Sequence, residues 1–210
     1  MYAECKKKEL FMAKRMIVLL MIFAGICPLF ADTWYVDAGA GGANNGTSWT
    51  DAFTDLQSAL SAASSGDEIW VAAGTYKPGT LRADTFQLVD GVDVYGGFDG
   101  TETNRSDRDF RNNQTILSGD IGTAGDNTDN CYHVVIGADN ATLDGFIIAY
   151  GYTTGAGSPY GGGIQCIDTS PTIQNCVLLE NFGSFGGGIY TNGTVDIKIY
   201  NCVFVDNTAS

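Results

Sequence analysis

A repeat in the second half of the chain restricts the possible folds more than any other feature. The stretch YGGGIQCIDTSPTIQNCVLLEN begins at Tyr160, and FGGGIYTNGTVDIKIYNCVFVDN begins at Phe185. Each stretch carries a glycine triplet, an Asn-Cys pair and a closing asparagine, in the same order and at nearly the same spacing. Because one such unit cannot bury an apolar face alone, units of this length in series predict a solenoid.

An earlier segment extends the repeat toward the N-terminus. Its equivalent positions have the same spacing as those of the Asn-Cys unit. The additional residues between the two segments fall in the stretch TTGAGSPY, which we interpret as an inserted loop. The sequence therefore predicts at least three related units. The matching positions are Leu143, Phe146, Ile148 and Gly151, followed by Ile173, Cys176, Leu178 and Asn181.

The return path of each unit distinguishes two solenoid classes. IQNCVLLEN also fits a leucine-rich repeat, but that architecture requires a helical segment on the return. Here the return is FGSFGGGIYTNGTVDIKI, which is rich in glycine and β-branched residues. We therefore predict an all-β parallel β-helix with several short strands per coil.

Alternation along the strands predicts which side chains face the core. We expect Cys176, Leu178, Cys202, Phe204, Phe146 and Ile148 to point inward, and Val177, Leu179, Val203 and Val205 to point outward. Asn181 and Asn207 are expected to form a side-chain ladder at a corner, and the glycines to lie at corners or close backbone approaches. A coil spacing of about 4.8 Å is slightly wide for a disulfide, which favours buried thiols over a bond. The pairing of Cys131, Cys166, Cys176 and Cys202 stays open.

Residues 1–31 resemble a secretory signal peptide. A basic stretch, KKKELFMAKR, precedes the apolar run MIVLLMIFAGICPLF, and small Ala31 comes before polar Asp32. The apolar run is too short for a membrane span, which requires about 20 residues. Met12 is an alternative start, and a lipid anchor at Cys27 is a second interpretation. We predict export to the cell surface or exterior, with no transmembrane span after cleavage.

Charge excludes several kinds of partner. Residues 1–31 carry five basic and two acidic side chains, so residues 32–210 carry six basic and 22 acidic ones, a net charge of −16. Such a surface repels nucleic acid and anionic lipid. It also repels polyanionic sugars unless cations bridge them.

Residues 32–75 are predicted to form an N-terminal cap with a strand-helix-strand order. Trp49, Phe53, Leu56, Leu60 and Ala63 recur at helical spacing, with Ser48 and Asp51 resembling a capping box. Residues 76–210 would then form the coils. Since a solenoid requires a cap at each end and no second cap is visible, we expect the chain to be truncated at its C-terminal end.

The same stretches resemble a known group of proteins. YVDAGAGGANNGTSWTDAFTDLQSAL, VAAGTY, GVDVYGGFDGTE, TILSGDI, LDGFIIAYG and the GGGI…NC…N units look like secreted bacterial right-handed parallel β-helix proteins of the pectin-lyase-like class. The GGGI…N units are also similar to polymorphic outer-membrane protein repeats. The resemblance implies a right-handed coil. It leaves activity open, since the class includes polysaccharide lyases, hydrolases, adhesins and passenger domains.

Few residues carry the chemistry of such enzymes. A glycosidase needs two carboxylates, and DNTDN at residues 126–130 matches only one polygalacturonase motif. Arg105, Arg108 and Arg111 cluster with Glu102, Asp107 and Asp109 in a predicted loop, which is where we expect function first. Asp120, Asp126 and Asp129 are candidate calcium ligands, and we predict no other cofactor. His133, the only histidine, is predicted to be structural.

We therefore predict a binding or structural protein of the cell surface or exterior, with no catalytic residue identified. Its expected partners are polysaccharides or cell-envelope components. Two alternatives stay open: a lyase or hydrolase acting on acidic polysaccharide, and the passenger domain of an outer-membrane system.

Overall fold

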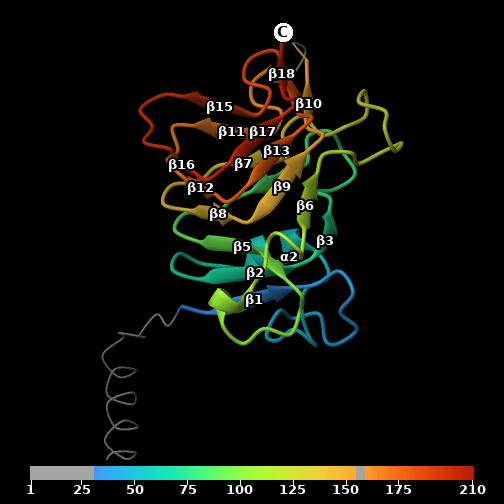
Figure 1. Ribbon diagram of the computed structural model, residues 1–210, viewed down its shortest axis with the longest axis vertical. Coiled ribbons are helices and arrows are strands. Elements are labelled where there is room, and N and C mark those ends of the chain that lie inside the picture. Colours follow the sequence, from blue (N-terminus) through green and yellow to red (C-terminus); the bar gives the residue numbers. More distant parts are fainter. Residues whose placement is uncertain (1–30, 155–158) are drawn as a thin grey trace, which may run out of the picture. The chain divides into compact units, whose positions relative to one another are not determined.

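The computed structural model describes residues 31–154 and 159–210, which form a parallel β-helix-like solenoid (Figure 1). The predicted fold class is confirmed: four parallel sheets stack in register around a core, together with one short α-helix. The predicted signal peptide, residues 1–31, lies outside the described residues except for Ala31. Within the described ranges, no helix has the length and apolar character to cross a membrane.

Each coil visits the sheets in a fixed order. One complete coil contains β12 (Thr172–Gln174), β13 (Val177–Leu179), β14 (Phe182–Gly183) and β15 (Ile189–Asn192). The next coil begins at β16 (Lys198–Tyr200), which pairs in parallel with β12. The four strands of this coil define the first, second, fourth and third sheets, in that order.

The other strands stack on these four. The first sheet also contains β1 (Thr33–Val36), β2 (Glu68–Ala72), β5 (Asp93–Phe98) and β8 (Thr142–Asp144). The second contains β3 (Gly74–Tyr76), β6 (Thr115–Ser118), β9 (Phe146–Ala149) and β17 (Val203–Val205). The third contains β4 (Phe86–Gln87), β7 (Val135–Ile136) and β11 (Ile164–Ile167), and the fourth contains β10 (Tyr152–Thr153) and β18 (Thr208–Ala209).

The strand register confirms the predicted alignment of the earlier segment with the Asn-Cys unit. Leu143 lies opposite Ile173, and Ile148 lies opposite Leu178. These four side chains are fully buried in one continuous core. The side chains that alternate with these core residues along each strand face outward, as Val177 does. The core therefore follows the alternation of inward and outward residues that the sequence predicts.

The last coil presents apolar side chains at the end of the core. Phe204 lies opposite buried Leu178 and so faces inward as predicted, but it is 51% exposed. Val203 and Tyr200 are also exposed.

The N-terminal helix is shorter than predicted. Helix α2 spans Leu56–Ala62, and Asp55 caps it by accepting a hydrogen bond from the Ser58 backbone N–H at 2.8 Å. The predicted capping box at Ser48 and Asp51 does form reciprocal hydrogen bonds, but within a loop, so the prediction of a helix start there was wrong. Helix α2 packs against β1, β2 and β4 and adds Leu56, Ala59 and Leu60 to the core.

Asparagine ladders link successive coils. The predicted ladder forms, since the Asn181 amide donates to Asn207 Oδ1 at 3.0 Å. Asn181 Oδ1 also accepts from the Gly151 backbone N–H at 2.9 Å, so the ladder reaches a third coil. A second ladder, which the sequence analysis did not predict, joins Asn201 to Asn175 at 2.7 Å.

The glycine triplets stand where coils approach most closely. A Cβ atom on Gly162 would lie 2.2 Å from the Phe182 carbonyl oxygen, and one on Gly187 would lie 2.2 Å from the Thr208 carbonyl oxygen. The recurrence of the triplet therefore reflects the same backbone contact in two successive coils, which only glycine permits.

All four cysteines of the described chain are free thiols. Cys176 is fully buried, and burial raises its pKa well above the usual value. Cys202, one coil further on, is only half-buried, and a hydrogen bond from Cys176 lowers its pKa to about 7. Burial raises the pKa of Cys131 to about 12 and that of Cys166 to about 11.

Cys202 is expected to react with iodoacetamide before the other three thiols do. The thiolate is the nucleophile, so the rate should fall about tenfold between pH 8 and pH 6 as Cys202 is protonated. Peptide mapping by mass spectrometry locates the label, and labelling of Cys5 and Cys27 in residues 1–31 is measured separately from that of the four thiols compared. Labelling of Cys131 or Cys166 at an equal rate would contradict the prediction.

Candidate functional site

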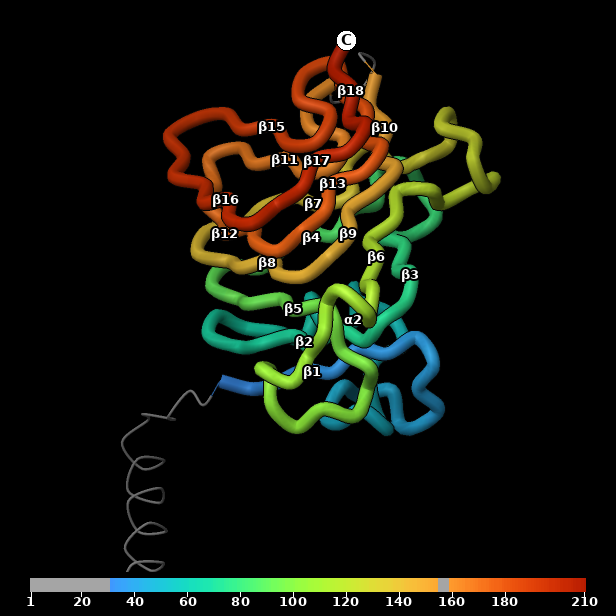
Figure 2. Tube along the Cα trace, viewed as in Figure 1, coloured from blue at the N-terminus to red at the C-terminus, as the bar shows by residue number. Residues whose placement is uncertain are grey.

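A long excursion leaves the coil between β5 and β6. Residues 99–114 contain one 3₁₀ turn, Arg105–Asp107, and fold back beside β2, as Figure 2 shows in light green. The Trp49 indole donates to the Glu102 carbonyl oxygen at 2.9 Å and so attaches the excursion to the N-terminal cap. Within the excursion, the backbone N–H of Asp109 donates to the Gly97 carbonyl oxygen of β5 at 2.8 Å.

The acidic residues of the excursion accept hydrogen bonds that stabilise the turns of the excursion itself. The Glu102 carboxylate accepts from the backbone N–H groups of Asp99 and Gly100, at 2.7 and 3.2 Å. Asp109 accepts from the side chain and backbone of Asn112, which lowers the pKa of Asp109. These acids thus fix the shape of the excursion, and they make no salt bridge with its arginines within the described residues.

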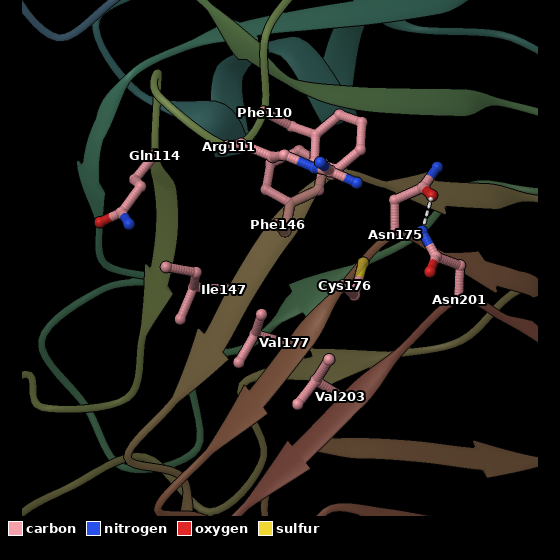
Figure 3. Close-up of a pocket in the computed structure, with 11 residues that line it drawn as sticks. Phe110, Arg111, Gln114, Phe146, Ile147, Asn175, Cys176, Val177, Asn201 and Val203 are labelled. Atoms are coloured by element: carbon pink, nitrogen blue, oxygen red, sulfur yellow. Dashed lines mark hydrogen bonds between the residues drawn. The ribbon is translucent and has the colours of Figure 1, made fainter.

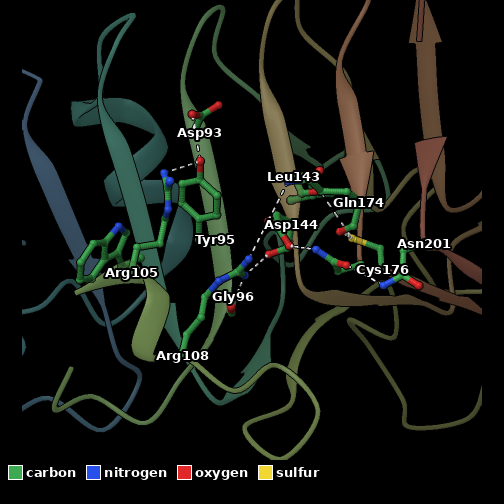
Figure 4. Close-up of polar contacts among 12 residues, drawn as sticks. Asp93, Tyr95, Gly96, Arg105, Arg108, Leu143, Asp144, Gln174, Cys176 and Asn201 are labelled. Carbon is green, nitrogen blue, oxygen red and sulfur yellow. Dashed lines mark hydrogen bonds and ion pairs between the residues drawn. The ribbon is translucent and has the colours of Figure 1, made fainter. Parts of the chain in front are cut away.

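Two of the three predicted arginines reach other coils instead. Arg105 Nη1 lies 2.6 Å from a Glu68 carboxylate oxygen and 2.8 Å from the Tyr95 hydroxyl (Figure 4). Arg108 Nη2 lies 2.6 Å from Asp144 Oδ2, and its Nη1 donates to the Gly96 carbonyl oxygen at 2.9 Å. The acids that lie near these arginines in the sequence, Glu102, Asp107 and Asp109, are therefore not their ion-pair partners.

Asp144 is the centre of a buried polar network. Its side chain is 5% exposed, and besides Arg108 it accepts from Gln174 at 2.9 Å and from Asn175 at 2.8 Å. Asn175 in turn accepts from Asn201, which extends the network over three coils (Figure 4). With both oxygens engaged, this carboxylate is a structural anchor rather than an available acid or base.

Arg111, the third arginine, lines a groove of about 310 Å³ beside the excursion. The floor is a row of aliphatic side chains from the second sheet, one per coil: Ile147, Val177 and Val203 (Figure 3). The polar rim consists of Arg111, Gln114, Asn175 and Asn201. Phe110, Gly145, Phe146 and Cys176 complete the lining, which contains no carboxylate.

The groove can hold a hydroxyl-bearing ligand that also has an apolar face. Its rim offers amide and guanidinium donors and amide acceptors, and its floor offers apolar contact. The guanidinium of Arg111 points toward Asn175 in Figure 3. Within the described residues it makes no hydrogen bond or salt bridge, although its charge contributes to lowering the pKa of Asp109. It is therefore the side chain of the predicted cluster that is available to a ligand.

The three candidate calcium ligands lie in the loop between β6 and β7. Asp126 is exposed near the tip, where its Oδ1 accepts from the Thr128 backbone and hydroxyl. Asp120 and Asp129 lie at the base of the loop, and each accepts one backbone N–H. In residues 31–154 and 159–210, no three or more His, Cys, Asp or Glu side chains converge as a metal site would require.

A family model described as "Protein of unknown function (DUF1565)" matches residues 38–209. The chain belongs to this family. The match extends from the loop after β1 to β18 and so includes the coils, the excursion and the groove. Comparison with curated proteins found no match, and comparison with solved structures found none.

His133 lies inside the DUF1565 region and away from the groove. It is 8% exposed, and its Nδ1 lies 2.9 Å from the Gly161 carbonyl oxygen, which can only accept a hydrogen bond. Burial lowers the pKa of His133. Its hydrogen bond joins two neighbouring coils at the glycine triplet.

Sequence reasoning missed several groove residues of this DUF1565 chain. Asn175 and Asn201 are the Asn of each Asn-Cys pair, so the recurrence of that pair was the signal of a second ladder. Asp144 carried no comparable signal, because its partner Arg108 lies far from it in sequence, in an excursion without a repeat. Val177 and Val203 of the aliphatic row were predicted to face outward, but nothing in the sequence placed Arg111 beside them.

Proposed function

We propose that the protein is an exported β-helix protein that binds an extended glycan in the groove beside Arg111. The carrying observation is the combination of a polar rim with an aliphatic row that continues from coil to coil. Coils are spaced by about 4.8 Å, which is close to the length of one sugar unit in an extended chain. Successive sugars could therefore meet equivalent positions on successive coils.

Export is the part of the proposal that rests on sequence alone. The basic stretch KKKELFMAKR, the apolar run MIVLLMIFAGICPLF and Ala31 precede the coils in the order of a signal peptide. Extracellular glycans and envelope polymers would then be the ligands within reach.

A binding role is favoured over hydrolysis by the groove's composition. Hydrolysis needs two carboxylates beside the sugar bond, and the described lining of this groove supplies none. The adjoining hollow contains Asp144, whose oxygens are engaged by Arg108, Gln174 and Asn175. The lyase alternative keeps one supporting observation, since the unengaged Arg111 could contact the carboxylate of an acidic sugar.

Calorimetric titration with cellohexaose and hexagalacturonate tests the proposal. We expect the neutral hexasaccharide to bind, because a net charge of −16 on residues 32–210 repels the polyanion. Arg111→Ala should weaken binding at least about tenfold, since a hydrogen bond from a charged group contributes about 1.5–3 kcal/mol. Arg105→Ala removes the same charge from the same excursion outside this groove and should change the affinity less than about twofold.

Two results would count against a binding protein. If neither sugar bound, or if Arg111→Ala bound normally, the groove would not be the ligand site. If hexagalacturonate bound and unsaturated ends were released, the lyase alternative would replace the proposal.

A further inference from the structure

A second hollow lies at the corner between the second and fourth sheets, close to β10, β14 and β18 near the top of Figure 1. Its volume is about 220 Å³. It is separate from the groove beside Arg111, because no described residue lines both. The corners of three successive coils and two asparagines of the loop between β6 and β7 form its walls.

Three lining residues occupy the same corner of successive coils. Strands β9, β13 and β17 pair in register, and the residues that follow them are Tyr150, Glu180 and Asp206. All three have a positive φ, of 66°, 50° and 51°. Because the same backbone conformation recurs at a coil spacing of about 4.8 Å, the side chains leave the corner in the same direction. The hollow therefore carries two carboxylates from neighbouring coils.

Two residue types at this corner are unfavourable for its backbone conformation. Among the described residues other than glycine, eight have a positive φ, and six of these are Asn or Asp. Asn and Asp tolerate the left-handed region better than other residues with a side chain do. Tyr150 and Glu180 are the two exceptions. Since the fold alone would favour asparagine at both positions, their side chains point to a role beyond folding.

Neither carboxylate of the hollow has a positively charged partner. The salt bridges within the described residues both belong to the excursion between β5 and β6. Arg82 lies near the hollow, but it donates to the backbone carbonyl oxygens of Asn130 and Tyr152, at 2.8 and 2.9 Å, and is not part of the lining. Arg82 therefore fixes the backbone around the hollow and leaves Glu180 and Asp206 unpaired.

A buried acceptor without a partner adds to the two carboxylates. Asn130 lines the hollow and is only 2% exposed, and its Oδ1 has no hydrogen-bond partner within the described residues. Its Nδ2 donates to the carbonyl oxygen of Tyr150, another lining residue, at 2.7 Å, which fixes the orientation of the amide. An unpaired buried acceptor is unfavourable, and a donor that enters the hollow would supply the missing partner.

The hollow also has an aromatic wall. The Tyr152 and Phe182 rings stack one coil apart, with centroids 4.8 Å apart and an interplanar angle of 25°. Both rings lie beside the carboxylates in the lining. Aromatic faces and carboxylates both attract a cation, and the rings also offer apolar contact. A matching ligand is therefore positively charged, donates hydrogen bonds and has apolar groups next to its charge.

We propose that this hollow binds an organic ammonium group through Glu180, Asp206 and the side-chain oxygen of Asn130. A primary ammonium carries three donors, and these three side chains supply the acceptors. A metal ion fits less well, since no three His, Cys, Asp or Glu side chains converge in the part of the chain that the structure describes. An amino sugar and a free diamine are two sources of such a group. The site is additional to the glycan groove, with which it shares no described residue.

Calorimetric titration of the purified chain with three probes tests the proposal. They are glucosamine tetrasaccharide, its fully N-acetylated counterpart and 1,4-diaminobutane, each in about 0.15 M salt to screen attraction by the acidic surface. We expect the free amine sugar to bind at least about tenfold more tightly than the acetylated one, because acetylation removes the charge and two donors. Tighter binding of the sugar than of the diamine would assign contacts to the sugar ring, and equal binding would assign recognition to the ammonium alone.

Matched variants locate the site. Glu180→Gln keeps the side-chain shape but removes a carboxylate, and should weaken binding of the glucosamine tetrasaccharide at least about tenfold. Asp196→Asn removes an exposed carboxylate between β15 and β16, outside the hollow, and should bind within about twofold of the wild type. Glu180→Asn should also lose binding, while its melting temperature should equal or exceed that of the wild type, because asparagine tolerates the positive φ. That measurement separates lost binding from lost folding.

Three outcomes would overturn the proposal. Equal binding of the free and acetylated sugars would mean that the ammonium is not recognised. Equal losses in Glu180→Gln and Asp196→Asn would mean that the general acidic charge, and not the hollow, attracts the amines. No binding of either amine up to about 10 mM would mean that the hollow holds water only. The glycan groove is tested separately, since Glu180→Gln should bind cellohexaose as the wild type does.

Discussion

Replacing Arg108 with alanine is expected to lower the free energy of unfolding by about 3–5 kcal/mol. The guanidinium is 2.6 Å from Asp144 Oδ2, and the two side chains are 11% and 5% exposed. Without Arg108, the Asp144 carboxylate stays buried with no positive partner. The carbonyl oxygens of Gly96 and Asp144 also lose their donor.

Urea denaturation followed by tryptophan fluorescence measures this effect. Arg105→Ala is a matched control in the same excursion, because Arg105 also forms an ion pair, with Glu68, but at side-chain exposures of 46% and 28%. An ion pair so open to solvent contributes about 0–1 kcal/mol. Arg108→Met combined with Asp144→Leu should recover part of the loss, since no buried charge is left alone. Equal losses in the two single arginine variants would refute a buried anchor.

The anchor also connects stability with the groove. Arg108 holds the excursion against β5 and β8, and Arg111 follows shortly after it on the same segment. Loss of the anchor would free the segment that carries Phe110 and Arg111 along the groove. The attachment of Arg108 to β5 and β8, and not the excursion alone, thus determines where Arg111 points.

The coils could be predicted from the sequence because their contacts repeat. The separation in sequence between Leu143 and Ile173, and between Asn181 and Asn207, reflects the register in which each coil stacks on the next. An apolar residue shifted by one position along its strand would point out of the core. The inward-facing positions can therefore be recognised from the sequence pattern.

The excursion and the helix boundary could not be predicted in the same way. The arginines have acidic neighbours in sequence, yet their partners Glu68 and Asp144 belong to β2 and β8, far away along the chain. Only packing against the first sheet selects these partners. The helix began later than expected because Ser48 and Asp51 satisfy each other within a loop, and Asp55 provides the actual cap.

Gly162 is expected to tolerate no side chain. It adjoins the hydrogen bond that the Phe182 N–H donates to the Gly151 carbonyl oxygen at 2.8 Å, which links two coils. A Cβ on Gly162 would lie 2.2 Å from the Phe182 carbonyl oxygen and 2.9 Å from the Gly151 carbonyl oxygen. Both obstacles are backbone atoms, so no side-chain rotation can relieve the overlap.

Gly162→Ala should therefore lower the free energy of unfolding by about 3 kcal/mol or more, because the coils must separate to admit the methyl group. Gly41→Ala is the control, since a Cβ there meets no atom within 4 Å. Its effect should stay within about 0.5 kcal/mol, as for other surface substitutions. Urea unfolding of both variants measures the difference. Similar stability in the two would mean that the coil spacing can widen locally. The recurrence of the triplet would then need another cause, because Gly187 makes the same approach to Thr208 one coil later.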